Sequence, residues 1–389
     1  MLLTQGACSE NVIDAFKIKV LDSETLNTGT ETDTDTDTET DTDTGKKDSD
    51  SPGDTQPLDT DSETGDTDTF TTDFIDGLYG YAKVNSLSQD GTTGGLGDDF
   101  PVTVTTGEEL QGAVDSCVLN PCIIIVEGSL TNIKGRVLVD GKSNISIIGK
   151  NADSELNGFG LTVFNSYNII IENLSIHNVE RDDKDCINIS GQSHHVWINH
   201  CNIFNDDAPA YSDSPYDSLI DISHASDFIT VSWCNFYDHV KTIYIGHSDD
   251  NIQEDTGHLK ITFHHNVFKK ISPTVLSYRF GTGHFFNNLF DMSPYFNDKI
   301  GVAIASRMGA CVRIENNVFD MVYDPVRTDF SGDTLETLGA VQLLGNEFTG
   351  NSADLITPVC EVEPPYQYKE ILNAPSKILS DLADKTGPK

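Results

Sequence analysis

From residue 123 onward the chain consists of short apolar runs separated by polar turns. Runs at 196–198, 229–231, 259–263 and 311–314 are rich in β-branched and aromatic residues and are too short for amphipathic helices. This pattern predicts many short β-strands, and therefore an all-β fold.

A short motif recurs along the same region: an asparagine, any residue, and then phenylalanine or tyrosine. The spacing between copies ranges from 22 residues (266 to 288) to 33 residues (202 to 235). A repeat that can bury its apolar face only against the next copy is typical of one coil of a right-handed parallel β-helix. The asparagines of the six copies are Asn202, Asn235, Asn266, Asn288, Asn317 and Asn346.

In a β-helix, we expect these asparagine amides to hydrogen-bond from coil to coil and the aromatic residues to stack inside. An immunoglobulin-like sandwich is the competing all-β fold. It needs a strand about every 8–12 residues with hairpin turns between, and it does not account for an asparagine repeat at coil length.

An open β-helix needs caps at its exposed edges. At the first edge, the sequence predicts a strand at 102–104 and then a short helix through Ser116, because Thr106 and Glu109 fit a capping box. At the other end, Ile378, Leu379 and Leu382 have helical spacing, so a C-terminal helix at 376–382 is expected to dock there.

The N-terminal part has a different composition. Residues 27–76 are dominated by Asp, Glu, Thr, Ser and Gly, which predicts a disordered acidic linker between an N-terminal segment (1–26) and a folded domain (77–389). Cys8 follows Leu-Leu-Thr-Gln-Gly-Ala, which is similar to the end of a bacterial lipoprotein signal. We therefore expect a secreted protein tethered to the cell surface through Cys8. An ordinary interdomain linker is the alternative.

The composition excludes several partners. A formal net charge of -38 and a pI near 4.3 would repel nucleic acid and anionic membranes. No apolar run is long enough to span a bilayer.

The eight cysteines form no CxxC pair that would suggest zinc, and a local bridge between Cys117 and Cys122 is expected. Cys201 and Cys234 stand at equivalent positions of the repeat, so we expect them to stack as buried thiols. A monomer is expected.

Two pairs of carboxylates stand beside apolar strand sequence. Asp217 and Asp221 lie in Tyr-Asp-Ser-Leu-Ile-Asp-Ile, and Asp183 and Asp185 precede the apolar run 186–189 one coil earlier. Residues that point outward from consecutive coils line up in rows, so the pairs are expected to meet. A cluster of carboxylates is suited to Ca²⁺. The alternative is a solvated acidic face.

Three basic residues follow in the next coils, namely Lys241, Arg279 and Arg307. Together with a calcium site they would form a groove suited to a polyanion, most simply a polyuronate. Three unrelated surface ion pairs are the alternative.

The motifs from residue 77 to about 350 resemble the pectate lyases of the first polysaccharide lyase family. VWINH (196–200) is similar to that family's VWIDH, with Asn199 in place of the usual Asp. The stretches YDSLIDI (216–222), KTIYIGHSDD (241–250), HLKITFHHN (258–266) and RFGTGHFFNN (279–288) follow in the family's order. The resemblance implies calcium ligation by Asp183, Asp185, Asp217 and Asp221, and substrate binding by Lys241, Arg279 and Arg307. The implied reaction is β-elimination of a 1,4-linked galacturonan.

One position departs from the family. Its signature has an arginine, taken as the catalytic base, five residues before the position of Arg279; here that position is Thr274. Either Arg279, Lys241 or Tyr278 takes the proton, or the protein binds polyuronate with little turnover. A glycoside hydrolase that uses two of the four aspartates is a further alternative. His264, His265 and His284 are expected to serve the framework.

Overall fold

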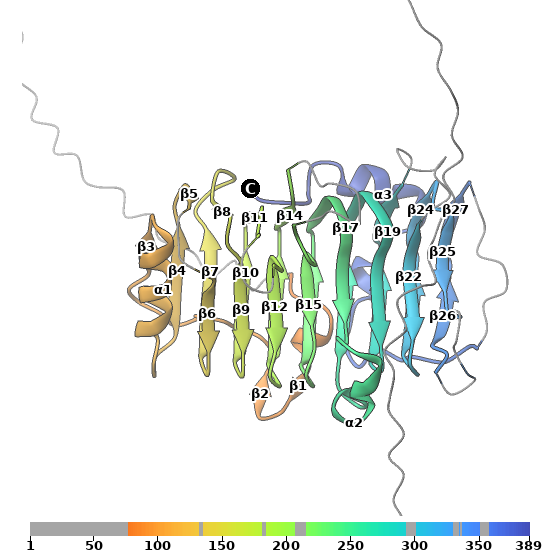
Figure 1. Ribbon diagram of the computed structural model, residues 1–389, viewed down its shortest axis with the longest axis horizontal. Coiled ribbons are helices and arrows are strands. Elements are labelled where there is room, and N and C mark those ends of the chain that lie inside the picture. Colours follow the sequence, from red (N-terminus) through yellow and green to blue (C-terminus); the bar gives the residue numbers. More distant parts are fainter. Residues whose placement is uncertain are drawn as a thin grey trace, which may run out of the picture. The chain divides into compact units, whose positions relative to one another are not determined.

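The computed structural model describes residues 77–131, 135–180, 184–206, 215–292, 301–329, 334, 337–350 and 358–389. Cys8 and the predicted linker lie outside these residues. The described chain is a right-handed parallel β-helix, as predicted, in which each coil contributes short strands to three faces (Figure 1). No helix in the described residues is long and apolar enough to cross a membrane.

The first face is a ten-stranded parallel sheet. Its central strands are almost entirely buried because the short elements at the chain's two ends cover their outer side. In order along the sheet, its strands are β3 (Val102–Val104), β4 (Cys122–Val126), β7 (Ser143–Gly149), β10 (Tyr167–Glu172), β13 (His194–Asn199), β16 (Asp227–Ser232), β18 (Lys260–His264), β20 (Thr282–Phe286), β23 (Cys311–Glu315) and β26 (Ala340–Leu344).

The second face follows the first in every coil and consists mostly of three-residue strands. Its middle position points inward and its two outer positions point away from the core. The strands are β5 (Ser129–Leu130), β8 (Glu155–Asn157), β11 (Ser175–His177), β14 (Asn202–Phe204), the first part of β17 (Asn235–Ile245), the first part of β19 (Val267–Arg279), β21 (Leu289–Asp291), β24 (Val318–Asp320) and β27 (Glu347–Thr349).

The third face closes each coil and carries the candidate site. The long strands β17 and β19 pass from the second face into the third without a break. The other strands of this face are β6 (Val137–Asp140), β9 (Leu161–Phe164), β12 (Ile187–Ser190), β15 (Ile220–Ile222), β22 (Val302–Arg307) and β25 (Asp324–Arg327).

The asparagine ladder is present in the last four copies of the motif. The Nδ2 atom of Asn266 donates to Oδ1 of Asn288 (3.0 Å), and the same contact joins Asn288 to Asn317 (2.9 Å) and Asn317 to Asn346 (3.1 Å). The aromatic residues of these copies stack in the core at ring separations of 4.8 to 5.0 Å, close to the strand spacing of a sheet.

The first two copies are out of register with the rest, which corrects the sequence prediction. Asn235 pairs with Val267 and not with Asn266, so Asn202 and Asn235 lie outside this ladder. They form a separate pair in which Nδ2 of Asn235 donates to Oδ1 of Asn202 (2.9 Å), so the predicted coil-to-coil amide contact is present there too. A shift of one residue reverses which face a side chain takes, and Phe204 and Tyr237 therefore stack on the outside. Their ladder positions are taken by Cys201 and Cys234, which are free, fully buried and adjacent, as predicted.

The first edge of the helix is capped as predicted. Helix α1 (Gly107–Ser116) begins at Thr106, whose hydroxyl accepts a hydrogen bond from the Glu109 amide (3.2 Å). The Glu109 carboxylate reaches back to Thr105 rather than to the Thr106 amide, so the capping box is not closed in its usual form. Leu110 and Val114 are buried against the core, and Cys117 is bonded to Cys122 as predicted.

The N-terminal segment crosses the outer side of the first face. The short helix η2 (Tyr81–Lys83) packs on β13, β16 and β18, and its amides donate to the hydroxyls of Thr262 and Thr230 (both 3.1 Å). It is followed by the antiparallel pair β1 (Asn85–Ser86) and β2 (Gln89–Asp90). These contacts explain why threonine is tolerated in buried strands of this face.

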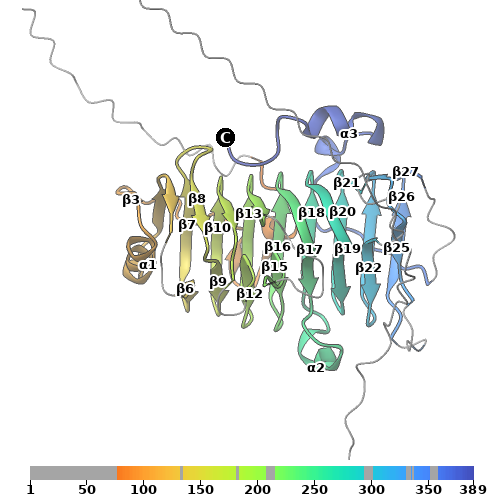
Figure 2. The ribbon, with the colours of Figure 1, turned by 45° about the horizontal axis from the view of Figure 1, so that its top comes forward.

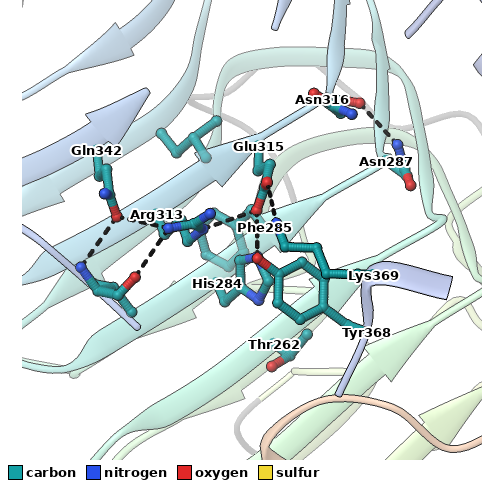
Figure 3. Close-up of polar contacts among 12 residues, drawn as sticks. Thr262, His284, Phe285, Asn287, Arg313, Glu315, Asn316, Gln342, Tyr368 and Lys369 are labelled. Carbon is teal, nitrogen blue, oxygen red and sulfur yellow. Dashed lines mark hydrogen bonds and ion pairs between the residues drawn. The ribbon is translucent and has the colours of Figure 1, made fainter. Parts of the chain in front are cut away.

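The C-terminal segment runs back along the outside of the β-helix (Figure 2). A disulfide joins Cys360 to Cys311 on β23, which the sequence did not indicate. Figure 3 shows the next anchor, where the buried Glu315 carboxylate accepts from Arg313 (2.8 Å), Tyr368 (2.8 Å) and Lys369 (2.7 Å).

Further along come η6 (Lys369–Ile371) and α3 (Pro375–Leu382). Ile378 and Leu382 of α3 pack against Val267, Leu289 and Val318, while Leu379 is 62% exposed. The C-terminal helix thus covers the flank of three coils, whereas the sequence prediction had it docking at the far end.

Candidate active site

Three of the four predicted metal-ligating aspartates lie in the described residues, and they gather on the third face. Asp221 is the central residue of β15, whereas Asp217 lies in the approach to that strand and not in a strand itself. Asp185 lies just before β12, one coil earlier, and is 4% exposed. Asp183 lies outside the described residues.

Asp185 is held firmly in place. Its Oδ1 accepts hydrogen bonds from the amide (2.9 Å) and the hydroxyl (2.6 Å) of Ser218. The buried guanidinium of Arg136 donates to the Asp185 carbonyl and to Thr162 and Leu161 (2.8 and 2.7 Å). These contacts connect the segment before β12 to Ser218 in the next coil and, through Arg136, to β9 in the preceding coil.

The pKa of the Asp221 carboxyl group is strongly raised. Burial raises the pKa of its carboxyl group to about 7, the charge of Asp185 adds to the rise, and Asp217 contributes a smaller share. Its Oδ1 is buried and has no hydrogen-bond partner among the described residues. A buried carboxylate oxygen in the field of two other carboxylates is unfavourable unless a proton or a cation balances it.

This donor set fits Ca²⁺, which prefers carboxylate, carbonyl and water oxygens in flexible geometry. Asp221 and Asp217 would supply ligand oxygens, as would the Asp185 oxygen that does not bind Ser218. The three aspartates alone do not form a closed cluster: within the described chain, no group of three or more His, Cys, Asp or Glu side chains is arranged to hold a metal ion. Any further ligand would come from elsewhere, and Asp183 stays a prediction.

Lys241 lies directly beside the acids. Its Nζ is 2.9 Å from Oδ1 of Asp217, and about a third of its side chain is exposed. Across the sheet it pairs with Thr274, at a point where the register between β17 and β19 shifts. The position at which the resemblance implies an arginine is therefore next to Lys241, with a short neutral side chain in its place.

Arg279 and Arg307 are neighbours at the ends of β19 and β22, where they are paired in register. Both contact Asp249, in the turn η4 (Asp249–Asn251) after β17: Oδ1 lies 2.6 Å from Nε of Arg279 and Oδ2 lies 3.0 Å from Nη2 of Arg307. Arg279 also donates from Nη1 to the carbonyl of Gly246 (2.8 Å).

The sequence prediction missed three residues of this region: Arg136, Ser218 and Asp249. Asp249 lies in KTIYIGHSDD and Ser218 in YDSLIDI, but nothing in the two motifs marks either residue as part of the site. Arg136 precedes β6, three coils before the strand of Asp221, so sequence spacing carries no signal for it.

Other candidates do not belong to the site. Tyr278 is fully buried, and its hydroxyl donates to the Leu259 carbonyl (2.5 Å), so it cannot take a proton from a substrate on the outer face. His264, His265 and His284 are buried on the first face. Burial lowers the pKa of each, which leaves them neutral framework residues, as expected.

A parallel β-helix that gathers carboxylates and cations on one outer face is the architecture of the β-helical polysaccharide lyases that the motifs resemble. The chain belongs to the pectate lyase family: the family model described as pectate lyase matches residues 80–372. It is an enzyme of the pectate lyase type.

The relatives and the solved structures agree with this assignment. The pectate trisaccharide-lyase of Bacillus licheniformis is 37% identical over 296 residues, which is 75% of this chain and 81% of that protein. The probable pectate lyase A of Aspergillus flavus is 41% identical over 244 residues, which is 63% of this chain and 70% of that protein. The crystal structure of pectate lyase Bsp165PelA from Bacillus sp. N165 in complex with trigalacturonate superposes with a TM-score of 0.69 at 30% identity, covering 80% of this chain and 99% of that one.

Proposed function

We propose that the protein cleaves 1,4-linked polygalacturonate, or a closely related polyuronate, by calcium-assisted β-elimination. The observation that carries the proposal is the buried Oδ1 of Asp221, which has no hydrogen-bond partner among the described residues and lies in the field of Asp185 and of Asp217, the partner of Lys241. This arrangement is suited to a divalent cation shared with a substrate carboxylate. The relative in the solved complex binds trigalacturonate, a short oligomer of the same uronic acid.

The residues divide into two roles. Arg279 and Arg307 bind uronate carboxylates and stabilise the negative charge that develops as the reacting sugar loses its C5 proton. Lys241 accepts that proton. Bound Ca²⁺ would supply Lewis-acid neutralisation of the same carboxylate.

The step balances without any further reactant. The C5 proton passes to the Lys241 amine, the electrons of the C5–H bond form a C4–C5 double bond, and the C4–O4 bond breaks. The departing O4 takes a proton from solvent. The products are a new reducing end and a 4,5-unsaturated sugar. Lysine is a better acceptor than arginine because its amine can be uncharged at alkaline pH, while arginine stays protonated.

The test incubates the full-length protein with polygalacturonate and CaCl₂ and follows the ultraviolet absorbance of the unsaturated product. Absorbance that requires calcium and disappears with a chelator is the expected result. New reducing ends without absorbance would show hydrolysis. Binding of the polymer without either product would show that the protein, with Thr274 in place of the family arginine, binds polyuronate without cleaving it.

An extracellular location, with attachment through Cys8, is part of the proposal. Pectate is a polymer too large to enter a cell, and the bonds Cys117–Cys122 and Cys311–Cys360 suit an oxidising compartment. Expression in a bacterial host with labelled fatty acid tests the anchor. Label and membrane association that disappear in Cys8→Ser are expected, and unlabelled protein in the medium would contradict lipidation.

A further inference from the structure

The two arginines of the site form an unfavourable pair unless something compensates their charge. Arg279 and Arg307 are paired in register on adjacent strands, which lie about 4.8 Å apart in a parallel sheet. Both side chains are largely enclosed, with exposures of 11% and 18%. Two enclosed guanidinium groups at this separation repel each other and would turn apart.

Asp249 bridges the two groups. One carboxylate oxygen contacts Nε of Arg279 at 2.6 Å and the other contacts Nη2 of Arg307 at 3.0 Å. Burial alone would raise the pKa of Asp249, but the hydrogen bond and charge of Arg279, followed by those of Arg307, outweigh it and hold the pKa below its usual value. The carboxylate is therefore ionised at neutral pH, where both arginines are charged.

The bridge leaves one nitrogen of Arg279 without a partner among the described residues. Its Nε and Nη1 are used by Asp249 and by the Gly246 carbonyl. Nη2 has no partner among the contacts of the described residues. The carboxylate and the carbonyl hold two different sides of the planar group, so the remaining donor has a fixed direction.

The backbone that carries Asp249 is itself well defined. Gly246 has a positive φ of 76°, and a Cβ atom there would come within 2.9 Å of the Arg279 Cβ. The Ser248 hydroxyl caps the following turn by accepting from the Asp250 amide (3.2 Å). Asp249 thus reaches the arginines from a fixed turn at the edge of the third face.

We propose that Asp249 is a positioning residue that sets the geometry of Arg279 and Arg307 for binding two carboxylates of an anionic polysaccharide. The proposal deepens the proposed function and rests on it. Asp249 acts through the arginines and does not touch the substrate. The opposite possibility is that Asp249 occupies the arginines in place of a substrate carboxylate, and the two make opposite predictions for substrate affinity.

The experiment compares Asp249→Asn and Asp249→Glu with Asp250→Asn, a control that removes the same charge from the next residue of the turn, whose side chain makes no described contact with either arginine. KM and kcat are measured on polygalacturonate at saturating CaCl₂. Loss of a charged hydrogen bond to each arginine is expected to raise KM about tenfold in Asp249→Asn, with kcat changed less than about threefold. Asp249→Glu should recover part of the loss, and Asp250→Asn should resemble the wild type.

A KM for Asp249→Asn at or below the wild-type value would overturn the proposal and favour the competing role. Thermal unfolding midpoints of all variants should agree closely, because the Asp249 side chain is about half exposed (47%) and its ion pairs are screened by solvent. If the wild type forms no unsaturated product, the proposed function fails instead. The positioning role is then tested by calorimetric titration with saturated oligogalacturonates, where Asp249→Asn should bind about tenfold more weakly and equal affinity would overturn it.

Discussion

Lys241 on β17 is paired in the parallel sheet with Thr274 on β19. The two side chains leave the same face of adjacent strands, so the threonine hydroxyl stands where the resemblance implies an arginine, beside the lysine. The site therefore has one cation fewer than the family pattern implies, and Lys241 is the nearest one that remains.

Replacing Thr274 by arginine should raise kcat on polygalacturonate. The new guanidinium would supply the arginine implied by the family pattern, and its charge would favour the neutral, proton-accepting form of Lys241. We expect a gain of about tenfold near neutral pH, measured as the initial rate of unsaturated product at saturating substrate. Thr274→Gln is the control for side-chain length, because glutamine is longer than threonine but uncharged, and it should give no gain. A fall in kcat with unchanged KM in Thr274→Arg would contradict the interpretation of this position.

Lys241→Arg should abolish most turnover while it keeps the positive charge. Arginine can still pair with Asp217, as Lys241 does at 2.9 Å, but it cannot lose its proton at the pH of the assay. Loss of a proton acceptor typically costs about 10²–10⁴-fold in kcat, and KM should change little. An active Lys241→Arg would show that Lys241 only binds substrate and that another group takes the proton.

The repeat shows how far the sequence could predict the fold. Asparagines and aromatics repeated at coil length were enough to predict a parallel β-helix, because each coil makes the same contacts with the next coil. The motif could not reveal that Asn202 and Asn235 are shifted by one residue relative to Asn266. Short strands of two- or three-residue length carry too little alternation to fix register from sequence.

The site was predictable to the extent that its residues come from consecutive coils. Asp185 and Asp217 lie in the approaches to β12 and β15, strands of consecutive coils, and Asp221 lies within β15, so coil spacing predicts that the three carboxylates are near one another. Asp249 was missed because it reaches the arginines from a turn, and turn conformation follows no strand periodicity. The bond between Cys311 and Cys360 was missed for a similar reason, since it depends on the path of the C-terminal segment.

Asp221→Asn should uncouple calcium from the stability of the protein. The wild type is expected to gain thermal stability with added CaCl₂ because a ligand that binds only the folded state stabilises it. Asp221→Asn removes a ligand oxygen's charge and also relieves the repulsion among the acids, so its midpoint without calcium should equal or exceed that of the wild type. Unfolding is followed by calorimetry with CaCl₂ or chelator. An equal calcium-dependent rise in wild type and variant would contradict the metal assignment, and Asp250→Asn serves as the control.

Glu172→Gln should increase stability at alkaline pH and have little effect at pH 4. Burial raises the pKa of Glu172 on β10 to about 7, although a hydrogen bond from Asn199 (2.7 Å) opposes the rise. The folded state thus binds more protons than the unfolded state between the ordinary carboxyl pKa and about 7. Stability is full below that window and falls as pH rises through it, by up to about 3 kcal/mol for a shift of this size. Glutamine does not ionise, so the loss should disappear.

The measurement is the free energy of unfolding from urea titrations at pH 4, 6 and 8, all with chelator so that calcium does not contribute. The difference between Glu172→Gln and wild type should grow from near zero at pH 4 to its full value at pH 8. Glu127→Gln is the matched control, because Glu127 is a half-exposed carboxylate paired with Lys150, and it should show no such trend. A pH-independent difference for Glu172→Gln would mean that the glutamine changes packing and that Glu172 is ionised in the folded protein throughout.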